Sequence, residues 1–482
     1  MSRQRYGFGI VTLHSLTSSS LSRQATIRGL PDNVLVDIFC YFLDDSESPR
    51  HWLTLANTCR RWRGIVFTFH RALRLQLRLF CTHRTPVQKT LDFWPTTLPI
   101  IVRYGGSPGL DAPAPEDEHG IIAALKPSHR VRSICLTVTS SLQKRLFKIS
   151  SLFSELEDLI LLSQESAPLI LPFSFLWGPR LRRLHSTRIT ILPLLELLSS
   201  SKNLVDLKLH EVLNPCNLSP EALTNALSGM AQLQSLSLRF LSTGNHVTPP
   251  SLSWSPIYFP ILTRFDFRGS IKYLEAFVSG IYAPRLGDIK FTFFNQAVID
   301  LSQIEIFIYR IKIQKSHRRA HILSSQRGIS ISLRQPGTPT RLRFRLICEP
   351  LRQQLFFLDR LCADFFTCFS NVEDLRISTF RPPGRTDGLY VDQWRDSIKS
   401  FIGVKRFRVA GNLSLDVMLV LQWFEIMLPA LHKLSISQPG PLNAHLREAV
   451  VSTMVSRRLS GHPIVVEYEQ LCDNSKICGT GT

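Results

Sequence analysis

The stretch Leu204-Val205-Asp206-Leu207-Lys208-Leu209-His210 contains the pattern from which the fold can be predicted. From Asp206 onward, polar and apolar residues alternate, which is the period of a β-strand with one buried face. The same apolar-x-x-apolar-x-apolar pattern recurs from Val131 to Leu286 at intervals of 23 to 29 residues. A strand unit repeated at this period predicts a solenoid of stacked parallel strands. The units begin at Val131, Leu156, Leu181, Leu204, Leu233, Leu262 and Leu286, and later at Val372, Val404 and Leu431. The gap between Leu286 and Val372 predicts about three further, blurred units.

Helical patterns lie between these strand units. Ser219-Pro220-Glu221 has the residues preferred at the N-cap and first turn of a helix, and Ser270 and Ser414 precede similar apolar patterns. Strands that alternate with helices predict an α/β solenoid over residues 71–470, with a parallel sheet on one face and helices on the other. Residues 442–468 predict a helix and a final strand that cap the stack, and residues 471–482 a flexible tail.

Composition limits the kinds of partner. The chain of 482 residues has a net charge of +20, which favours an acidic partner, a polyanion or a membrane surface. No apolar run of about 18 residues is free of charges, so we expect no transmembrane helix and no membrane partner. The ten cysteines contain no C-x-x-C pair, which predicts reduced thiols in the cytoplasm or nucleus and no metal site.

Residues 1–26 contain no acidic residue and many Ser and Arg residues. This composition resembles that of a mitochondrial transit peptide, and it also suits a disordered basic leader. We predict a disordered leader, and the sequence leaves the targeting role open.

Residues 27–70 predict a small helical module. Pro31 suits the first turn of a helix, and Leu35, Ile38, Phe39 and Phe42 follow at the spacing of one apolar helix face. Two further short helices carry Trp52, Leu53 and Leu55, and then Cys59 and Trp62. So many large apolar residues on so small a unit predict that another molecule covers part of its surface.

This module resembles an F-box. The resemblance rests on an ordered set of residues: Leu30-Pro31, Val34-Leu35, Ile38-Phe39, Leu43, Trp52-Leu53, Leu55 and Cys59-Arg60-Arg61-Trp62. The polar insert at residues 44–50 departs from the family pattern and lengthens the first loop. The resemblance implies docking on a Skp-type adaptor, and through it on a cullin. The implied adaptor-binding residues are Leu30, Pro31, Leu35, Ile38, Leu55, Cys59 and Trp62.

The repeats resemble an irregular leucine-rich repeat. The family usually places Asn or Cys three residues after the last apolar position, whereas this chain has residues such as Thr139, Ser270 and Phe294 there. The ladder is therefore degenerate, and the curvature is left open. An F-box followed by such repeats resembles a large fungal F-box family. That resemblance implies a substrate receptor of a Skp–cullin–F-box ubiquitin ligase, which performs no bond chemistry and needs no cofactor.

Strand alternation also predicts a target-binding face. Residues that alternate with the buried ones point outward and align into one surface when the strands stack. Basic residues outnumber acidic ones at these positions, which favours an acidic or phosphorylated protein target. We expect Asp206 to neutralise Lys208 and Asp288 to neutralise Lys290. Near the C-terminal end, Arg406, Arg408 and Lys433 are expected to have no acid among these positions. The predicted target-binding residues are Arg264, Arg268, Lys290, Arg376, Arg406, Arg408 and Lys433.

A basic solenoid that binds nucleic acid or another anionic partner, without a ligase, is the alternative. The repeats have no regularly placed aromatic residues for base stacking, which argues against nucleic acid. The densest basic run, from Arg310 to Arg319, suits either a polyanion patch or a solvated edge.

Two catalytic motifs are incomplete. Gly105-Gly106-Ser107-Pro108-Gly109 matches a hydrolase nucleophile elbow, but Glu116 to Glu118 after it predict a solvated loop instead of the required helix. His210-Glu211 begins a zinc motif that lacks its second histidine, because Asn214 stands there. We therefore expect no enzyme.

Overall fold

The computed structural model describes most of the chain in sixteen segments. These are residues 27–44, 51–82, 87–105, 115–149, 151–165, 169–172, 178–212, 218–241, 256–294, 299–311, 317–338, 340–380, 391–411, 414–423, 427–438 and 444–470. The predicted leader, most of the polar insert, Ser107, Asn214 and the predicted tail lie outside them. The chain divides into two units, residues 1–76 and 77–482, and each is considered by itself.

The first unit contains a short 3₁₀ turn and three helices. These are η1 (Ile27–Gly29), α1 (Asp32–Asp44), α2 (His51–Thr58) and α3 (Arg60–Thr68). Leu35, Phe39, Ala56 and Val66 are buried between the helices, each at most 1% exposed. The three-helix module predicted from the apolar spacing is therefore present.

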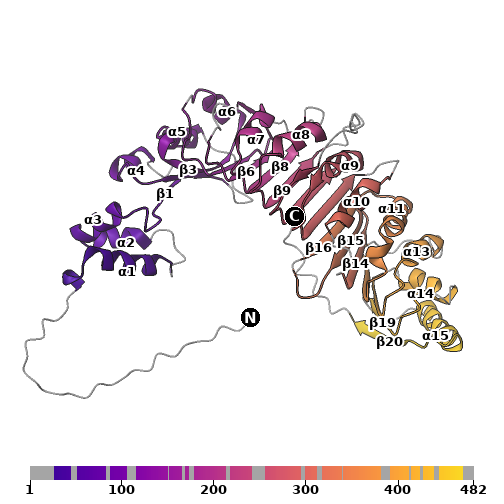
Figure 1. Cartoon of the computed structure of the whole chain (residues 1–482). Helices are drawn as coiled ribbons and strands as arrows, with labels where there is room; N and C mark the ends of the chain where they lie inside the picture. The colour runs from indigo at the N-terminus through magenta and orange to yellow at the C-terminus, as the bar shows by residue number, and fades with distance from the viewer. Residues whose placement is uncertain are drawn as a thin grey trace, which may run out of the picture. The chain divides into compact units, whose positions relative to one another are not determined.

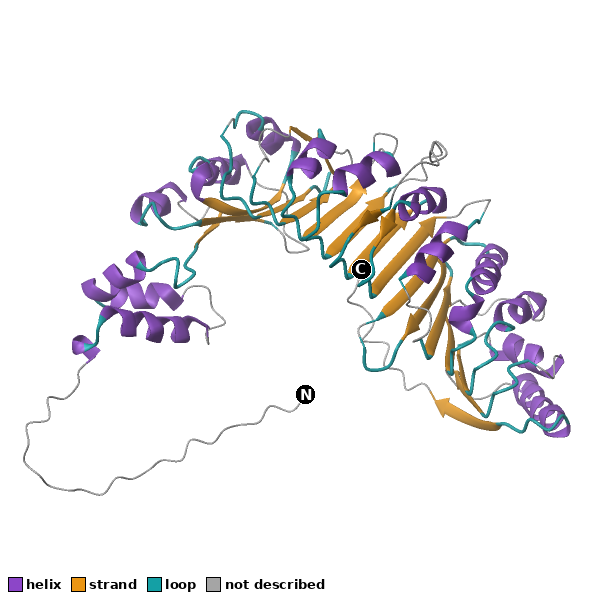
Figure 2. Ribbon diagram, in the orientation of Figure 1, coloured by secondary structure: helices purple, strands orange, loops and turns teal. Residues whose placement is uncertain are grey.

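In the second unit, the described residues contain one sixteen-stranded sheet and two small two-stranded sheets. The described helices lie on one side of the large sheet (Figures 1 and 2), and no described helix covers its other side, which we call the bare face. The large sheet has the order β1-β2-β3-β4-β6-β8-β9-β11-β13-β16-β15-β14-β17-β18-β19-β20, and the small sheets are β5-β7 and β10-β12. The strands are β1 (Leu77–Phe80), β2 (Ile100–Tyr104), β3 (Val131–Thr137), β4 (Asp158–Leu162), β5 (Leu169–Pro172), β6 (Arg183–Thr187), β7 (Ile189–Leu192), β8 (Asp206–Val212), β9 (Ser235–Phe240), β10 (Ile257–Tyr258), β11 (Arg264–Gly269), β12 (Ile281–Tyr282), β13 (Asp288–Phe294), β14 (Arg319–Ser325), β15 (Gly328–Arg334), β16 (Arg341–Ile347), β17 (Asp374–Phe380), β18 (Arg406–Ala410), β19 (Lys433–Gln438) and β20 (Val465–Gln470).

The helices that cover the sheet come from the connections between strands. They are α4 (Val87–Phe93), α5 (Pro115–Leu125), η2 (Ser128–Arg130), α6 (Ser140–Leu146), α7 (Leu194–Ser200), α8 (Pro220–Leu227), α9 (Ile271–Ser279), α10 (Ser302–Arg310), α11 (Leu351–Asp364), α12 (Phe366–Phe369), α13 (Val391–Ile398), α14 (Ser414–Trp423) and α15 (Ala444–Leu459). The predicted solenoid, with strands on one face and helices on the other, is confirmed. The predicted C-terminal helix and strand correspond to α15 and β20, and β20 pairs with β19 at the end of the sheet.

The local signals in the sequence explain these elements. In β8, Leu207 and Leu209 are buried, as the alternation predicts. The hydroxyl oxygen of Ser219 accepts the backbone N–H of Ala222 at 3.1 Å, which caps α8. Ser270 caps α9 in the same way through the N–H of Tyr273. Polar side chains at helix N-caps satisfy backbone donors that have no partner inside the helix.

At two of the positions where the repeat family has Asn or Cys, this chain has a residue that caps the following helix. Thr139 accepts the N–H of Leu142 at 3.1 Å and caps α6, and Ser270 has the same role for α9. Ser186 replaces an apolar residue in the third unit, and its buried hydroxyl donates to the carbonyl of Ile189 at 2.7 Å. The departures from the repeat pattern therefore have local hydrogen-bonding explanations.

The prediction of three blurred parallel units between Leu286 and Val372 is wrong. β16 pairs in parallel with β13, but β15 pairs antiparallel with both β16 and β14, and β14 then pairs in parallel with β17. The connections between β14, β15 and β16 are too short for a crossover helix, so consecutive strands must run antiparallel. Gly328 permits the first turn, because its φ is +148° and a Cβ there would lie 2.0 Å from the Leu346 carbonyl oxygen.

The middle of the buried core consists of phenylalanine more than leucine. Phe265, Phe291 and Phe344 lie on β11, β13 and β16, and each is at most 1% exposed. Their rings are 5.6 and 5.7 Å apart between centroids, in edge-on geometry. Aromatic pairs of this kind stabilise a core beyond their buried area.

The prediction that Glu116 to Glu118 form a solvated loop is also wrong. These residues begin α5, and the side chain of Glu118 is 2% exposed. Glu118 accepts hydrogen bonds from Ser141 at 2.9 Å and forms an ion pair with Arg145 at 3.1 Å. Pro115 followed by acidic residues is the usual start of a helix, because a carboxylate is favoured near the positive N-terminal end of the helix dipole. Ser107, the residue of the motif that could act as a nucleophile, lies outside the described residues.

Candidate functional site

Helix α1 of the first unit has apolar residues on both its inner and its outer surface. Leu35 and Phe39 face the module's core, whereas Ile38 is 42% exposed and Tyr41 is 80% exposed. The sequence predicts that Leu35, Ile38, Phe39 and Phe42 form one apolar face. In the structure only Leu35 and Phe39 are buried, because Phe42, like Ile38, is 42% exposed. An exposed apolar strip of this kind marks an interaction surface. We call Ile38, Tyr41 and Phe42 the α1 strip.

The start of α1 is held against α3. The guanidinium of Arg61 donates to the Leu30 carbonyl and to the Asp32 carboxylate, the latter at 2.6 Å from Nη2. This fixes the turn that presents Pro31, which is exposed. Arg61 is therefore a positioning residue for the Leu-Pro turn, a role that the sequence analysis does not assign to it.

The predicted adaptor-binding residues divide by burial. Leu35 and Leu55 are 0% and 6% exposed and belong to the module's own core. Trp62 is half-buried, with its ring 4.8 Å from that of Phe39. Cys59 is exposed, and its Sγ accepts the N–H of Trp62 at 3.4 Å as the N-cap of α3. The exposed or half-exposed residues available for contact are Leu30, Pro31, Ile38, Cys59 and Trp62.

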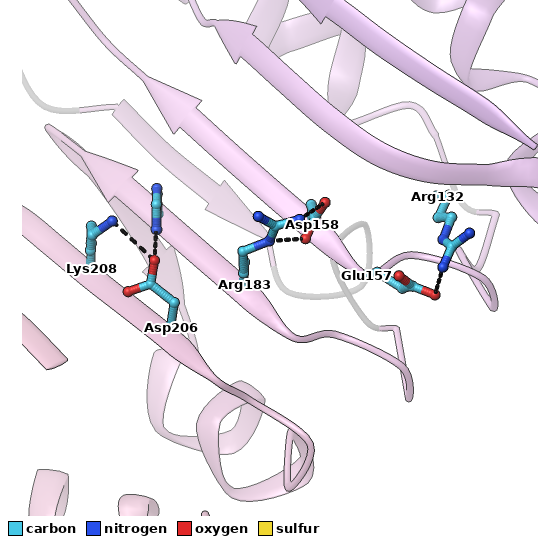
Figure 3. Close-up of polar contacts among 7 residues, drawn as sticks. Arg132, Glu157, Asp158, Arg183, Asp206 and Lys208 are labelled. Carbon is cyan, nitrogen blue, oxygen red and sulfur yellow. Dashed lines mark hydrogen bonds and ion pairs between the residues drawn. The ribbon is translucent and has the colours of Figure 1, made fainter. Parts of the chain in front are cut away.

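The bare face of the large sheet in the second unit carries aligned polar side chains. On its N-terminal part, acidic and basic residues pair (Figure 3): Arg183 Nη2 donates to Asp158 at 2.8 Å, and Asp206 accepts from Lys208 at 3.0 Å. His185 also contacts Asp206, at 2.7 Å. The predicted neutralisation of Lys208 by Asp206 is confirmed.

Farther along this face, Asp266 holds two bases. Arg239 lies 2.5 Å and Lys290 3.8 Å from its carboxylate. The prediction that Asp288 neutralises Lys290 is therefore wrong: Lys290 is paired with Asp266, directly across in the register of β11 and β13. Arg268, on β11, lies over the ring of Phe294 at 5.3 Å, a cation–π contact.

An open hollow of about 540 Å³ lies on this face between β8 and β16. Its lining includes bases and acids from neighbouring strands: Lys208, Arg239, Asp266, Lys290, Arg341 and Arg343. Arg264, which the sequence analysis assigns to the target-binding face, also lines the hollow and is exposed. The hollow gives the face a recess into which a ligand side chain can fit.

On the C-terminal part of the face, two of the predicted target-binding bases form ion pairs within the chain. Arg406 lies 3.4 Å from Asp374 on the neighbouring strand, and Lys433 lies 2.6 Å from Glu467 on β20. The prediction that these bases have no acid among the outward positions is therefore wrong for Arg406, because Asp374 stands at such a position. The partner of Lys433, Glu467, lies on the capping strand β20. Arg376 and Arg408 are directly across from each other in the register of β17 and β18, and both are exposed.

A group of arginines on β15 and β16 is absent from the residues predicted for the target-binding face. Arg341, Arg343 and Arg345 lie at alternate positions of β16, and Arg334 on β15 is opposite Arg341. They were missed because these strands fall in the segment whose repeat pattern is blurred. The alternation R-L-R-F-R-L at 341–346 is the signal that could have identified them.

Three histidines in the second unit are kept neutral. The pKa values of His210, His317 and His321 are each lowered to about 4, chiefly by burial. For His321, the guanidiniums of Arg376, Arg334 and Arg343 contribute to this shift. In an unfolded chain the pKa of histidine is about 6.5. The unfolded state therefore binds more protons than the folded state between these two pH values.

We expect the contribution of these histidines to stability to be fully present above about pH 6.5 and to be lost as the pH falls to about 4, whereas the raised pKa of Glu275, about 7, acts in the opposite direction. The variant His321→Gln should show a smaller loss across this window. Urea unfolding midpoints of the full chain at several pH values provide the measurement, with the exposed His462→Gln as a matched control. Equal pH dependence in the two variants would contradict this assignment.

Comparison with known proteins agrees with the first unit's helices. Residues 27–74 match the F-box-like family model. None of the curated proteins matches the chain. A solved structure to which this chain is similar is that of the leucine-rich repeat-containing protein LegL7 from Legionella pneumophila, with 12% sequence identity and a TM-score of 0.28. The match covers 81% of this chain and 99% of that one.

The chain thus has an F-box-like domain followed by a leucine-rich-repeat-like solenoid. F-box domains generally bind Skp-type adaptors. Among the described residues, no helix is long and apolar enough to cross a membrane. Within that same part of the chain, no three or more His, Cys, Asp or Glu side chains form a group that could hold a metal ion.

Proposed function

We propose that this chain is the substrate-receptor subunit of a Skp–cullin–F-box ubiquitin ligase. The F-box-like domain docks on the Skp-type adaptor, and the bare sheet face of the solenoid holds a protein target. The chain performs no bond chemistry itself. It acts in the cytoplasm or nucleus by raising the local concentration of the target near a ubiquitin-conjugating enzyme.

One observation carries this proposal. The residues that match the F-box-like model contain a helix, α1, whose inner surface builds the domain and whose outer surface exposes the α1 strip. The described residues of the first unit leave Ile38 42% and Tyr41 80% exposed. An adaptor with a complementary apolar groove provides that cover.

The alternative, a basic solenoid that binds nucleic acid without a ligase, has support in the net charge of +20 and in the arginines of β16. It is the weaker proposal because this face lacks aromatic side chains where the arginines gather. Between the arginines of β16 and Arg376, the bare face presents Ser330, Ser332, His321 and Leu323, without Phe, Tyr or Trp on which bases could stack.

Affinity purification of the tagged full-length chain from its own cells tests the proposal. We expect a Skp-type adaptor and a cullin to copurify, and treatment of the lysate with a nuclease to leave their recovery unchanged. Recovery of nucleic acid without adaptor or cullin would favour the alternative and contradict the ligase role.

A further inference from the structure

Helix α15, the last helix of the second unit, has apolar residues on its outer as well as its inner side. Inner residues such as Leu446 are buried against the rest of the unit. On the opposite side, the exposed fractions are 56% for Val451, 53% for Val455 and 84% for Leu459. Met454, between them in the sequence, is 39% exposed. We call Val451, Met454, Val455 and Leu459 the α15 strip.

The α15 strip lies at the end of the solenoid. Figure 1 shows α15 beyond α14 in the row of helices, and β20 is the last strand of the large sheet. Helix α13 contacts both α11 and α14, and among the described side chains of α13 and α14 no large apolar one is exposed. Tyr468 of β20 is 50% exposed on the helix-covered side of the sheet, where it stands opposite the buried Ile436 in the register. A solenoid with an apolar end associates with other molecules unless that end is covered.

The residue spacing on the outer side of α15 is that of a contact between two helices. Glu448, Val451, Val455 and Arg458 follow one another at intervals of three, four and three residues. Residues at these intervals form one narrow seam along a helix, as the a and d positions of a coiled coil do. The seam of α15 therefore has two valines in its middle, an acid toward its N-terminal end and a base toward its C-terminal end.

This order of residues is self-complementary. When a second helix of the same sequence packs antiparallel, with Val451 level with Val455 of the second copy, Glu448 is level with Arg458 of the second copy. Both pairs have the same midpoint along the helix, so a two-fold axis makes each contact twice. Antiparallel packing also places the N-terminal end of each helix beside the C-terminal end of the other, which the helix dipoles favour.

Within one chain these charges have no such partner. Glu448 and Arg458 are ten residues apart on one helix, which is about 15 Å at 1.5 Å per residue, so they cannot pair with each other. Among the described residues, no ion pair includes either of them. Residues 471–482, which follow β20 in the sequence, contain two large apolar residues, Leu471 and Ile477, fewer than the strip has. A second copy supplies an apolar residue for each valine and an opposite charge for each end of the seam.

We propose that two copies of this chain associate through α15, antiparallel about a two-fold axis, so that the α15 strip of each copy covers that of the other. The association uses neither the α1 strip nor the bare face, so the dimer presents two copies of each. The inference is independent of the proposed function, because it concerns a different surface.

Sedimentation equilibrium of the full-length chain tests the inference. We expect the weight-average mass to rise with concentration from the monomer's 54.9 kDa toward twice that value. A contact between two helices is small, so the Kd of the dimer should be about 1–100 µM. Val451→Asp should raise this Kd at least about thirtyfold, because it places two unpaired carboxylates in an apolar contact. Phe356→Asp is the matched control, since Phe356 is 52% exposed on α11, outside the α15 strip, and should leave the Kd unchanged.

Charge reversal shows whether the partner is a second copy. At low ionic strength, Glu448→Lys or Arg458→Glu alone should each raise the Kd about tenfold, because both symmetric pairs become repulsive. An equal mixture of these two single variants should recover the dimer, since every pair in the mixed dimer joins opposite charges. The double variant, Glu448→Lys with Arg458→Glu, should recover it as well.

Circular dichroism confirms that each variant is folded. A chain that stays monomeric up to about 100 µM would overturn the inference. The same holds for a dimer that Val451→Asp leaves intact or that Phe356→Asp weakens equally. Failure of the mixed single variants to recover the dimer would also overturn it, because the antiparallel contact of Glu448 with Arg458 of the second copy requires that recovery.

Discussion

Replacing Ile38 with Asp is expected to remove capture of the Skp-type adaptor while the F-box-like domain stays folded. Ile38 is 42% exposed beside Tyr41, so a polar side chain there is tolerated in the free chain. In a complex, the carboxylate would be buried without a partner in an apolar contact. Truncating such anchors costs about 2 kcal/mol or more, and an unpaired buried charge costs more still. The adaptor affinity should therefore fall at least about thirtyfold.

Titration of the purified adaptor into the full-length variant provides the measurement, and circular dichroism confirms that the domain is folded. Asn33→Asp is the matched control, because it adds the same charge to an exposed position of α1 outside the α1 strip. Adaptor affinity that is unchanged in Ile38→Asp would exclude the α1 strip from the contact.

The variant Phe39→Ala should unfold the first unit and leave the second intact. Phe39 is 1% exposed, and its ring contacts that of Trp62 at 4.8 Å. Deleting a buried phenylalanine side chain costs about 3–5 kcal/mol, and a domain of this size has roughly that much stability in total. Leu35→Ala should act in the same direction.

Limited proteolysis measures this effect, because the first unit should become sensitive while the second stays resistant. Tyr41→Ala is the control: its side chain is 80% exposed, so its removal should change stability by less than about 0.5 kcal/mol. Equal protease resistance of Phe39→Ala and the unsubstituted chain would contradict the assignment of Phe39 to the core.

The repeating part of the fold was predictable because its signals are local. The alternation in Leu204 to His210 sets the buried side of β8, and Ser219 and Ser270 mark the starts of α8 and α9. A strand period and a cap depend on a few neighbouring residues, so the sequence shows them directly.

The antiparallel strands β14, β15 and β16 could not be predicted from the repeat pattern alone. Strand patterning is visible in Arg341 to Leu346, but pairing direction follows from the length of the connections and from turns such as that at Gly328. A search for one repeat period passes over such strands. The arginines of β16 were missed for the same reason.

The sequence showed which residues of the sheet face point outward, but not which of them form ion pairs with each other. The outward positions were correct for Arg376 and Lys290, yet the partner of Lys290 is Asp266 on the next strand. Such cross-strand pairs depend on register, which no single stretch of sequence specifies. In the first unit, the spacing of Leu35 and Ile38 did not reveal that one is buried and the other exposed.

Docking of the F-box-like domain on a Skp-type adaptor can be measured by isothermal titration calorimetry of the purified adaptor with the full-length chain. We expect one adaptor to bind per chain, with a Kd below about 1 µM, which corresponds to about −8 kcal/mol. A folded chain that shows no binding at adaptor concentrations well above that Kd would exclude the proposed docking.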